Sequence, residues 1–374
     1  VDQAVWVQAA NMEISADIHL TRHPDFVLDV EMTVQPQGIT ALYGSSGSGK
    51  STLLRLLAGL ERGTRKDRIE ITSGKTVWQS EQIFVPPERR GIGFVFQQQQ
   101  LFPHLSVQGN LDFALSRQHT EQNLEVNQVY DWLNLHSLLD KEISQLSGGE
   151  AQRVAIARVL LNGAKCIFMD EPLGSIDSPS RSRILPYLDR LHRNLQIPMV
   201  YVSHSYEEIT YLADHLFVLD NGKITSQGSM LELCSSIELN SGEGDAAAVV
   251  IQCTVAKHDL DYRLSELDFE GANIFVNAEQ YQVGDSLRVR IPAKDVSITT
   301  TRPGNSSILN ILEVQIVSFE ENSGPSVLVR LRRNKQFVLA RITKKSLNLL
   351  DLQPGQTVYA QIKSVALLME SIDD

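Results

Sequence analysis

The first residues that can do chemistry form a glycine-rich stretch between Gly44 and Thr52. The stretch fits the pattern G-x-x-x-x-G-K-[ST] at every position, and its residues are Gly44, Ser45, Ser46, Gly47, Ser48, Gly49, Lys50, Ser51 and Thr52. Glycine lets backbone N–H groups close around phosphate oxygens, which a side chain would block. Lys50 can then reach the β- and γ-phosphates, and the Ser51 hydroxyl can ligate Mg²⁺. The stretch predicts a binding site for a nucleoside triphosphate.

The elements around this loop are those that such a site needs. The apolar run 39–43 predicts a buried strand that leads into the loop. Leucines follow at helical spacing and predict a helix; they are Leu53, Leu54, Leu56, Leu57 and Leu60. The N-terminus of this helix adds about half a unit of positive charge beside the phosphates. The alternative, a flexible turn before an ordinary helix, does not explain why strand, loop, Lys-Ser pair and helix occur in this order.

Two acidic residues follow another apolar run. Residues 166–169 predict a buried strand, and Asp170 and Glu171 come directly after it. Open α/β sheets bind their ligands at the carboxyl ends of the strands. We therefore predict that Asp170 holds Mg²⁺ through a water and that Glu171 polarises the water that attacks the phosphate. An exposed acidic strand end is the alternative, and the lack of charge within the strand disfavours it.

Gln97 and His204 also stand at the ends of predicted strands. Residues 92–96 predict a buried strand that delivers Gln97, which can then touch the metal ion or its water. Residues 198–202 predict another buried strand shortly before His204. A histidine at a strand end is usually structural, but one at the same sheet edge as Glu171 can contact the γ-phosphate. The sequence therefore groups Gln97 and His204 with Glu171.

A second possible anion site begins at Ser147. Ser147, Gly148 and Gly149 precede the apolar positions of a predicted helix, so backbone N–H groups there can face an anion. One nucleotide does not need two such sites in one pocket. A plain helix N-cap followed by a glycine turn is the alternative for these residues taken alone.

The start of the chain is predicted to form antiparallel strands, because apolar and polar residues alternate from 12 to 34. An aromatic ring near here is needed to stack on a nucleotide base. Phe26 and His23 are the candidates, with a core or turn role as the alternative for each. Much later in the chain, Asp220-Asn221-Gly222 predicts a type I′ hairpin turn.

Composition limits the class of protein. The chain has 374 residues, enough for two or three domains. Its net charge of −11 argues against nucleic acid as a partner, since nucleic-acid binders usually carry a basic face. Three unclustered cysteines indicate a reducing cytosol. No apolar run reaches the roughly 18 residues that a spanning helix needs, so we expect any membrane role to come through a partner.

The chain is expected to consist of four parts. Residues 1–11 are an extension ahead of Met12, 12–235 a nucleotide-binding domain, 236–248 a linker, and 249–374 an all-β domain. The all-β part contains a repeat, because residues 353–362 echo residues 282–291 at a distance of 71 positions. The repeat predicts two small barrels of the OB type, with coincidental turn chemistry as the alternative.

Residues 12–240 resemble the ATPase subunit of an ABC transporter. The motifs of that family occur in the expected order: the phosphate loop, Gln97, the signature Leu146-Ser147-Gly148-Gly149-Glu150, the pair Asp170-Glu171, the loop 173–177 and His204. Many members carry Gln where this chain has Glu150, and Ala and Leu where it has Gly174 and Ile176. The family's Tyr or Trp that stacks on adenine has no clear counterpart.

The resemblance implies an α/β P-loop NTPase domain with a helical subdomain, which binds ATP and Mg²⁺. It assigns catalysis to Glu171, His204 and Gln97, and metal contacts to Ser51, Gln97 and Asp170. It also implies a head-to-tail homodimer, in which Ser147 and Gly149 of one subunit grip the γ-phosphate held by Lys50 of the other. In the family, a segment corresponding to 97–115 passes motion to two transmembrane permease subunits at the cytoplasmic face of the inner membrane.

The all-β part resembles the oxyanion-regulatory (TOBE/Mop-like) domain of molybdate importer ATPases. The matching segments are 293–297, 306–310, 340–346 and 359–365, with 185–188 and 197–199 in the ATPase part. The resemblance implies import of molybdate or tungstate, delivered by a periplasmic oxyanion-binding protein. It also implies a regulatory oxyanion site, to which Ser307, Thr343, Lys363 and Ser364 can contribute. A barrel that only supports dimerisation is the alternative.

Three other functions stay open at this point. One is the ATPase of an importer for sulfate, ferric iron or a sugar. Another is an ABC ATPase of DNA repair or the ribosome, which usually has two cassettes, a coiled-coil insertion or a basic surface; this sequence has none of them. The third is a cytosolic oxyanion sensor with a vestigial ATPase, which the intact Lys50, Asp170, Glu171 and His204 disfavour.

Overall fold

The computed structural model describes residues 12–23, 26–64, 66–118, 124–195, 197–241, 244–277, 281–321, 324–363 and 366–367. They form two compact units, which we describe separately. The first comprises the chain up to Ser205 together with Leu212–Gln227, and the second comprises Tyr206–Tyr211 and the chain from Gly228. The extension expected at residues 1–11, and Ser364, lie outside the described residues. None of the described helices is long and apolar enough to cross a membrane.

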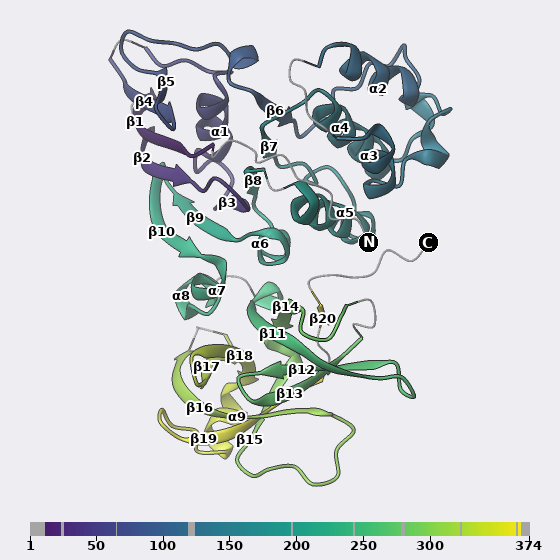
Figure 1. Ribbon diagram of the computed structural model, residues 1–374. Coiled ribbons are helices and arrows are strands. Elements are labelled where there is room, and N and C mark those ends of the chain that lie inside the picture. Colours follow the sequence, from purple (N-terminus) through teal and green to yellow (C-terminus); the bar gives the residue numbers. More distant parts are fainter. Residues whose placement is uncertain are drawn as a thin grey trace. The chain divides into compact units, whose positions relative to one another are not determined.

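A ten-stranded sheet with the order β5-β4-β1-β2-β10-β9-β3-β8-β7-β6 organises the first unit (Figure 1). Its strands are β1 (Ile14–His23), β2 (Phe26–Val34), β3 (Ile39–Tyr43), β4 (Arg68–Ser73), β5 (Thr76–Gln79), β6 (Ile92–Val95), β7 (Cys166–Asp170), β8 (Met199–Ser203), β9 (His215–Asp220) and β10 (Lys223–Ser229). Strands β6, β7, β8, β3 and β9 pair in parallel. Strands β2, β1, β4 and β5 pair antiparallel, as the alternation in the sequence predicts.

The helices of the first unit do not all pack in the same place. They are α1 (Lys50–Ala58), α2 (Val107–Ser116), α3 (Val126–Trp132), α4 (Gly148–Leu161) and α5 (Ser178–Leu195), while α6 (Tyr206–Leu212) begins the part assigned to the second unit. Figure 1 shows α2, α3 and α4 together in a helical group, whereas α1 lies beside the strands of the sheet. The mixed sheet with its separate helical group is the α/β architecture that the sequence predicts.

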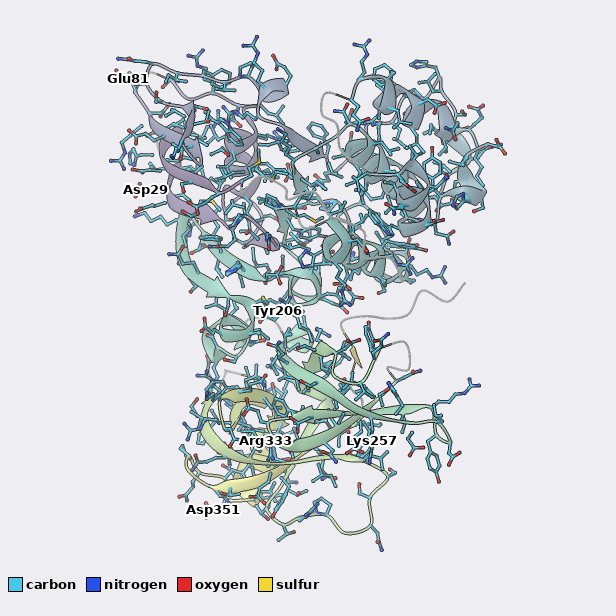
Figure 2. All side chains as sticks on the ribbon, viewed as in Figure 1. Asp29, Glu81, Tyr206, Lys257, Arg333 and Asp351 are labelled. Atoms are coloured by element: carbon cyan, nitrogen blue, oxygen red, sulfur yellow. The ribbon has the colours of Figure 1, made fainter. Side chains whose placement is uncertain are left out.

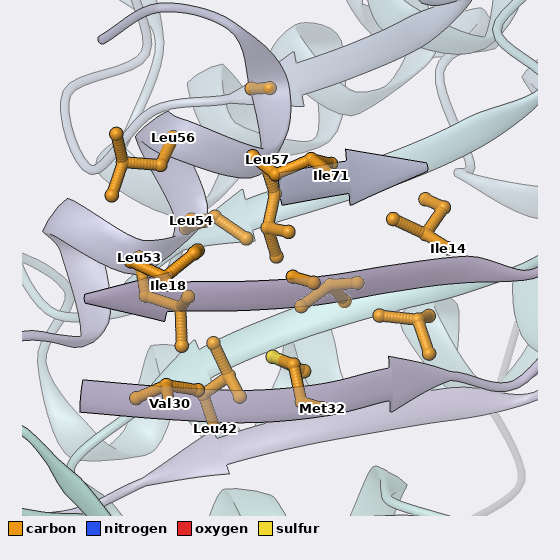
Figure 3. Packing of buried hydrophobic residues seen from close by; sticks show 14 of the residues in the cluster. Ile14, Ile18, Val30, Met32, Leu42, Leu53, Leu54, Leu56, Leu57 and Ile71 are labelled. Carbon is orange, nitrogen blue, oxygen red and sulfur yellow. The ribbon is translucent and has the colours of Figure 1, made fainter. Parts of the chain in front are cut away.

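The leucines of α1 anchor the helix in the largest part of the core. Four of them are completely buried: Leu53, Leu54, Leu56 and Leu57. Figure 3 shows them packed with side chains of β1, β2, β3 and β4, including Ile14, Ile18 and Ile71. Each fully buried leucine contributes roughly 1.5–3 kcal/mol. The predicted fifth leucine, Leu60, lies beyond the end of the helix at Ala58 and is 44% exposed.

One sequence expectation needs correction, and a second gains detail. The strand predicted at 92–96 ends at Val95, and Phe96 is 37% exposed. Strand β6 ends the sheet, so it has a neighbouring strand on one side only, and three of its four residues are half-buried. The expected linker 236–248 contains helix α8 (Ile237–Ser241), whose Asn240 is fully buried. The Asn240 side chain accepts from the Ala248 N–H and donates to the Cys234 carbonyl, which orders this segment.

The second unit contains two five-stranded sheets, ordered β13-β12-β11-β14-β20 and β15-β19-β16-β17-β18. Their strands are β11 (Ala248–Asp259), β12 (Leu264–Phe269), β13 (Ala272–Val276), β14 (Ser286–Pro292), β15 (Val296–Thr299), β16 (Asn310–Glu321), β17 (Ser326–Arg333), β18 (Gln336–Thr343), β19 (Thr357–Ile362) and β20 (Ala366–Leu367). Short helices α7 (Met230–Leu233) and α9 (Lys344–Leu349) complete it. The all-β fold predicted for this half is therefore confirmed.

The two sheets repeat one pattern of contacts. The N–H of Gly284 donates to the Val255 carbonyl at 2.8 Å, and the N–H of Gly355 donates to the Ile316 carbonyl at 2.7 Å. Strand β11 pairs with β14 as β16 pairs with β19, and a bulge follows Val255 and Ile316 alike. Each half also lends a strand to the other, since β15 pairs with β19 and β20 pairs with β14. These contacts support the duplication that the sequence repeat predicts.

Arg333, labelled in Figure 2, ties the two sheets together. Its guanidinium donates to the Phe269 carbonyl in one sheet at 3.4 Å and to the Glu313 carbonyl in the other at 2.9 Å. The duplicated halves thus share strands and side-chain bonds. The compact units divide near Gly228. The domain boundaries expected at residues 235 and 249 stay predictions.

Candidate functional site

Strand register brings the predicted site residues to one edge of the first unit's sheet. Val95 of β6 lies opposite Met169 of β7, and Asp170 of β7 lies opposite Val202 of β8. Tyr43, which precedes the phosphate loop, lies opposite Ser203. Because these strands run parallel, the residues that follow each of them emerge at the same edge. This edge therefore collects the Gln97 segment, the Asp170-Glu171 pair, His204 and the phosphate loop.

The phosphate loop is held by close backbone contacts. A Cβ atom at Gly44 would lie 2.0 Å from the Leu219 carbonyl oxygen, so only glycine fits there. Lys50 is 4% exposed, and its ammonium donates to the carbonyls of Gly44 and Ser45, both at 2.8 Å. Burial lowers the pKa of Lys50, while the nearby charges of Glu171 and Asp170 act in the opposite direction. The loop thus fixes a desolvated cation beside two carboxylates.

Ser51 and Asp170 form the candidate metal site. The Ser51 hydroxyl donates to a carboxylate oxygen of Asp170 at 2.7 Å, and Asp170 is 4% exposed. Burial raises the pKa of Asp170, against the effect of the Ser51 hydrogen bond and of the Arg55 guanidinium, which lies 3.8 Å away. Hydroxyl and carboxylate oxygens are ligands that Mg²⁺ prefers, and a buried carboxylate gains from a bound cation. These residues fit a magnesium ion.

Arg55 was not among the residues expected at this site. It follows Ser51 by four positions in α1, and residues at that spacing share one face of a helix. This spacing is the sequence signal that could have identified it. Its guanidinium faces the same carboxylate that the Ser51 hydroxyl contacts.

Glu171 adopts a left-handed backbone conformation, with φ of 44°. For a residue other than glycine this conformation costs about 1–2 kcal/mol. Two backbone hydrogen bonds hold it: the Glu171 N–H donates to the Val202 carbonyl, and its carbonyl accepts from the Gly174 N–H, both at 3.0 Å. The turn directs the carboxylate toward His204, whose Nδ1 lies 3.2 Å from Oε2. The Glu171 side chain is 19% exposed and that of His204 is 49% exposed.

Gln97 approaches Glu171 across Gly174. A Cβ atom at Gly174 would lie 3.3 Å from Oε2 of Glu171 and 3.4 Å from Nε2 of Gln97. An alanine there would be in tight contact with Glu171 and in ordinary contact with Gln97. The structure brings Gln97, Glu171 and His204 together as the sequence predicts, although their catalytic roles stay predictions.

Ser147 lies apart from this group. It is the N-cap of α4, where its hydroxyl accepts from the Glu150 N–H and its own N–H donates to the Glu150 carboxylate at 2.7 Å. Lys141 contacts the same carboxylate at 3.0 Å. Gly148 is exposed, with no atom within 4 Å of its Cβ direction. In the described part of the chain, no hydrogen bond joins Ser147 to the phosphate loop, and Figure 1 shows α4 away from α1.

The structure describes the side chain of only one of the two residues expected to stack on the base. Phe26 is half-buried, and its ring edge lies 3.0 Å from the Cβ direction of Gly49, so it packs against the phosphate loop. It also borders the hydrophobic cluster around α1. The side chain of His23 is outside the described part of the structure. Stacking on adenine stays a prediction for both rings.

The expected oxyanion residues are spread over the second unit. Asn310 pairs with Ile362, which places the segment that contains Ser307 at the same strand end as Lys363. The side chains of Ser307 and Lys363 are exposed. The Thr343 hydroxyl is used as the N-cap of α9, because it accepts from the Ser346 N–H at 3.0 Å. The structure therefore aligns Ser307 with Lys363, while Thr343 serves a helix.

Comparison with known proteins agrees with this geometry. Residues 27–174 match the family described as ABC transporter, and residues 306–369 match the family described as TOBE domain. A bacterial Atm1-family ABC exporter with ATP bound has a similar fold, with a TM-score of 0.51 and 22% identity over 66% of this chain and 43% of the exporter. The fold and the site are those of an ATPase of the ABC transporter class.

Relatives that align with nearly the whole chain define the family more narrowly. The molybdenum import ATP-binding protein ModC of Methylococcus capsulatus is 42% identical over 94% of this chain and 99% of its own length. The protein of the same name from Hahella chejuensis is 43% identical over 96% of this chain and 99% of its own length. The chain belongs to the family of molybdenum import ATP-binding proteins.

The Glu150 capping interaction generates a pH prediction. The hydrogen bond from the Ser147 backbone lowers the pKa of Glu150 from 4.5 to about 2, and Lys141 adds to this effect against burial. A carboxylate with a depressed folded-state pKa contributes stability that is fully present above pH 4.5 and lost as pH falls toward about 2. Glu150→Ala should therefore reduce the free energy of unfolding by about 1 kcal/mol at pH 7, and by less as the pH falls below 4.5.

Urea unfolding across this pH range measures the effect. Glu81→Ala is the control, because Glu81 is exposed and projects from the first unit in Figure 2. Its effect should stay within about 0.5 kcal/mol at every pH. A Glu150→Ala deficit that does not shrink on acidification would contradict the assignment.

Proposed function

We propose that this chain is the ATPase subunit of an importer that carries molybdate or tungstate across the inner membrane. The observation that carries the proposal is the single sheet edge at which the phosphate loop, Ser51, Asp170, Glu171 and His204 meet. Membership of the molybdenum import family supports the choice of cargo. The TOBE match in the second unit supports it further.

The site residues have complementary tasks in ATP hydrolysis. The loop N–H groups and Lys50 bind the phosphates, and the electrostatic stabilisation of developing negative charge is the largest contribution. Mg²⁺, held by Ser51 and Asp170 with Gln97 nearby, would neutralise charge on the β- and γ-phosphates. Glu171 accepts a proton from the attacking water as a general base. His204 Nδ1 lies 3.2 Å from the Glu171 carboxylate, so this histidine can orient the carboxylate. Its imidazole would also serve as the proposed contact to the γ-phosphate.

The chain acts as a head-to-tail homodimer in this proposal. Ser147 and Gly148 are exposed at the N-terminus of α4, away from the phosphate loop of their own chain. A second copy can therefore present its phosphate loop to them. Each ATP then lies between Lys50 of one subunit and Ser147 of the other, so that ATP binding closes the dimer and hydrolysis releases it.

The helical group is the proposed contact with two permease subunits. Phe102 and Phe113 form an edge-to-face ring pair 4.8 Å apart, and Arg158 lies 5.1 Å from the Phe102 ring. Phe113 is 42% exposed, so the cluster offers an apolar surface that follows the Gln97 segment in the chain. In this proposal the helical group lies at the cytoplasmic face of the membrane. A periplasmic oxyanion-binding protein would deliver cargo to the opposite side.

The second unit is proposed to sense the cargo. Ser307 and Lys363 are both exposed at one end of the β16–β19 pair, and a cation is needed there because a dianion loses hydration on binding. Occupancy by molybdate or tungstate would slow ATP turnover. A coupling of about 1–3 kcal/mol between the two sites is sufficient for such regulation.

Replacing the general base should separate binding from hydrolysis. Glu171→Gln keeps ATP binding but should reduce turnover by about 10²–10⁴-fold, because an amide does not accept the proton. The ATP-bound dimer should accumulate in size-exclusion chromatography. Glu81→Gln, at an exposed position of the same unit, is the matched control and should hydrolyse ATP normally. Near-normal hydrolysis by Glu171→Gln would exclude the role given to Glu171.

Mixing two inactive variants tests the composite site. Lys50→Ala damages the phosphate loop, and Ser147→Arg damages the opposing surface. A heterodimer of the two chains regains one intact site, which combines Lys50 from one chain and Ser147 from the other. ATPase activity should therefore appear on mixing, whereas either variant alone stays inactive. Confirmed heterodimers without activity would argue against the head-to-tail arrangement.

Calorimetry on the full chain tests the regulatory site. Molybdate and tungstate should release or absorb heat on binding, and sulfate should do so less. Lys363→Met should weaken binding by about tenfold or more, since a hydrogen bond to a charged group contributes roughly 1.5–3 kcal/mol. Lys257→Met removes a lysine that pairs with Glu266 at 2.8 Å and serves as control. Equal molybdate affinity in all three proteins would exclude Lys363 as a ligand, and no heat with molybdate or tungstate would leave the barrels a structural module.

A further inference from the structure

Arg90 is a buried cation that the mechanism above does not use. It is 1% exposed, and burial lowers its pKa to about 10. In the described part of the chain, no carboxylate lies within ion-pair distance of it. A charge in such a place must be compensated by hydrogen bonds, because its desolvation is costly.

The bonds of Arg90 end on the last turn of α1. One guanidinium nitrogen donates to the carbonyls of Leu56 at 3.0 Å and Leu57 at 2.7 Å. The last four carbonyls of a helix have no N–H partner within the helix, and the carbonyls of Leu56 and Leu57 are two of them. The helix dipole also favours a cation at this end. A second nitrogen donates to the Val85 carbonyl at 2.9 Å. Arg90 thus caps the end of α1 opposite to Lys50 and Ser51.

The surroundings keep the guanidinium in one position. Its carbon lies 5.5 Å from the Trp78 ring and 5.4 Å from the Phe84 ring, which adds cation–π attraction. Gly59, at the end of α1, leaves space for it: a Cβ atom there would lie 2.6 Å from Nε of Arg90. The fork geometry of arginine serves several acceptors at once, which a lysine ammonium does not match.

Arg90 also belongs to the segment that leads to Gln97. It precedes β6 (Ile92–Val95) by two positions, and β6 pairs with β7 immediately before the site. Helix α1 carries Ser51 at its start, and the segment after β6 carries Gln97. One side chain therefore joins the two elements that supply Ser51 and Gln97 to the proposed metal site.

We propose that Arg90 is a positioning residue that sets α1 against the Gln97 segment and thereby determines magnesium affinity. The inference rests on the proposed ATP and Mg²⁺ site. The phosphates are bound mainly by the loop and by α1 itself, so their affinity depends little on Arg90. Magnesium needs oxygens from both elements, so its affinity depends on the distance that Arg90 fixes.

The test uses the full chain and compares wild type, Arg90→Lys and Gly59→Ala. Arg90→Lys keeps the charge but loses the fork. Gly59→Ala places a Cβ atom against the guanidinium and strains the left-handed backbone at the end of α1, without touching the nucleotide. The readout is the Mg²⁺ concentration that gives half of the ATP-dependent rise in melting temperature. Both variants should raise this concentration by about tenfold, as substitutions behind metal ligands do. ATP binding in EDTA should be unchanged, and the Mg²⁺ requirement of hydrolysis should rise in parallel.

Met32→Ala is the control for general destabilisation, because Met32 is buried in β2 and is not one of the hydrogen-bond or ring partners of Arg90 described above. It should lower the melting temperature and leave the Mg²⁺ midpoint at its wild-type value. Variants of Arg90 and Gly59 that behave like Met32→Ala would overturn the inference and leave the magnesium site intact. A wild-type protein whose ATP-dependent stabilisation ignores Mg²⁺ would overturn the magnesium site itself, and the inference with it.

Discussion

The parallel pairing of β6, β7, β8 and β3 is the constraint on which the site depends. Neighbouring parallel strands end at the same edge of the sheet. The four segments that follow β6, β7, β8 and β3 therefore all begin at that edge. A shift of one residue would turn the side chains of a strand to the opposite face. Because β7 and β8 are buried along their whole length, such a shift is strongly disfavoured.

The site concentrates charge in a place with little water. Lys50 and Asp170 are both nearly buried, and burial lowers the pKa of Lys50 and raises the pKa of Asp170. The charge of each residue acts on the pKa of the other in the opposite direction. A triphosphate and a divalent cation bring the missing opposite charges to this edge. The strained backbone of Glu171 fits the same logic, since strain of this kind persists where surrounding bonds hold it and is common at functional sites.

The sequence predicted those features that depend on local pattern. The phosphate loop and the strand before Asp170 are readable because each pattern lies within a few neighbouring residues, and the repeat at 282 and 353 is readable from the sequence alone because its two copies share residues at matching positions. The exposure of Phe96 was missed because it depends on which strand ends the sheet. Burial of Asn240 and capping by Arg90 were missed for a similar reason: their partners are set by tertiary structure. The roles of the site residues and the domain boundaries stay predictions.

The most direct test of the account is ATP-driven uptake of radiolabelled molybdate into proteoliposomes that hold this chain and the permease subunits proposed as its partners. The binding protein is supplied on one side and ATP on the side of the ATPase. The account predicts uptake that requires both ATP and Mg²⁺, stops when ATP is replaced by a non-hydrolysable analogue, and is not competed by sulfate. Steady ATP hydrolysis by the assembled complex without molybdate entering the vesicles would contradict it.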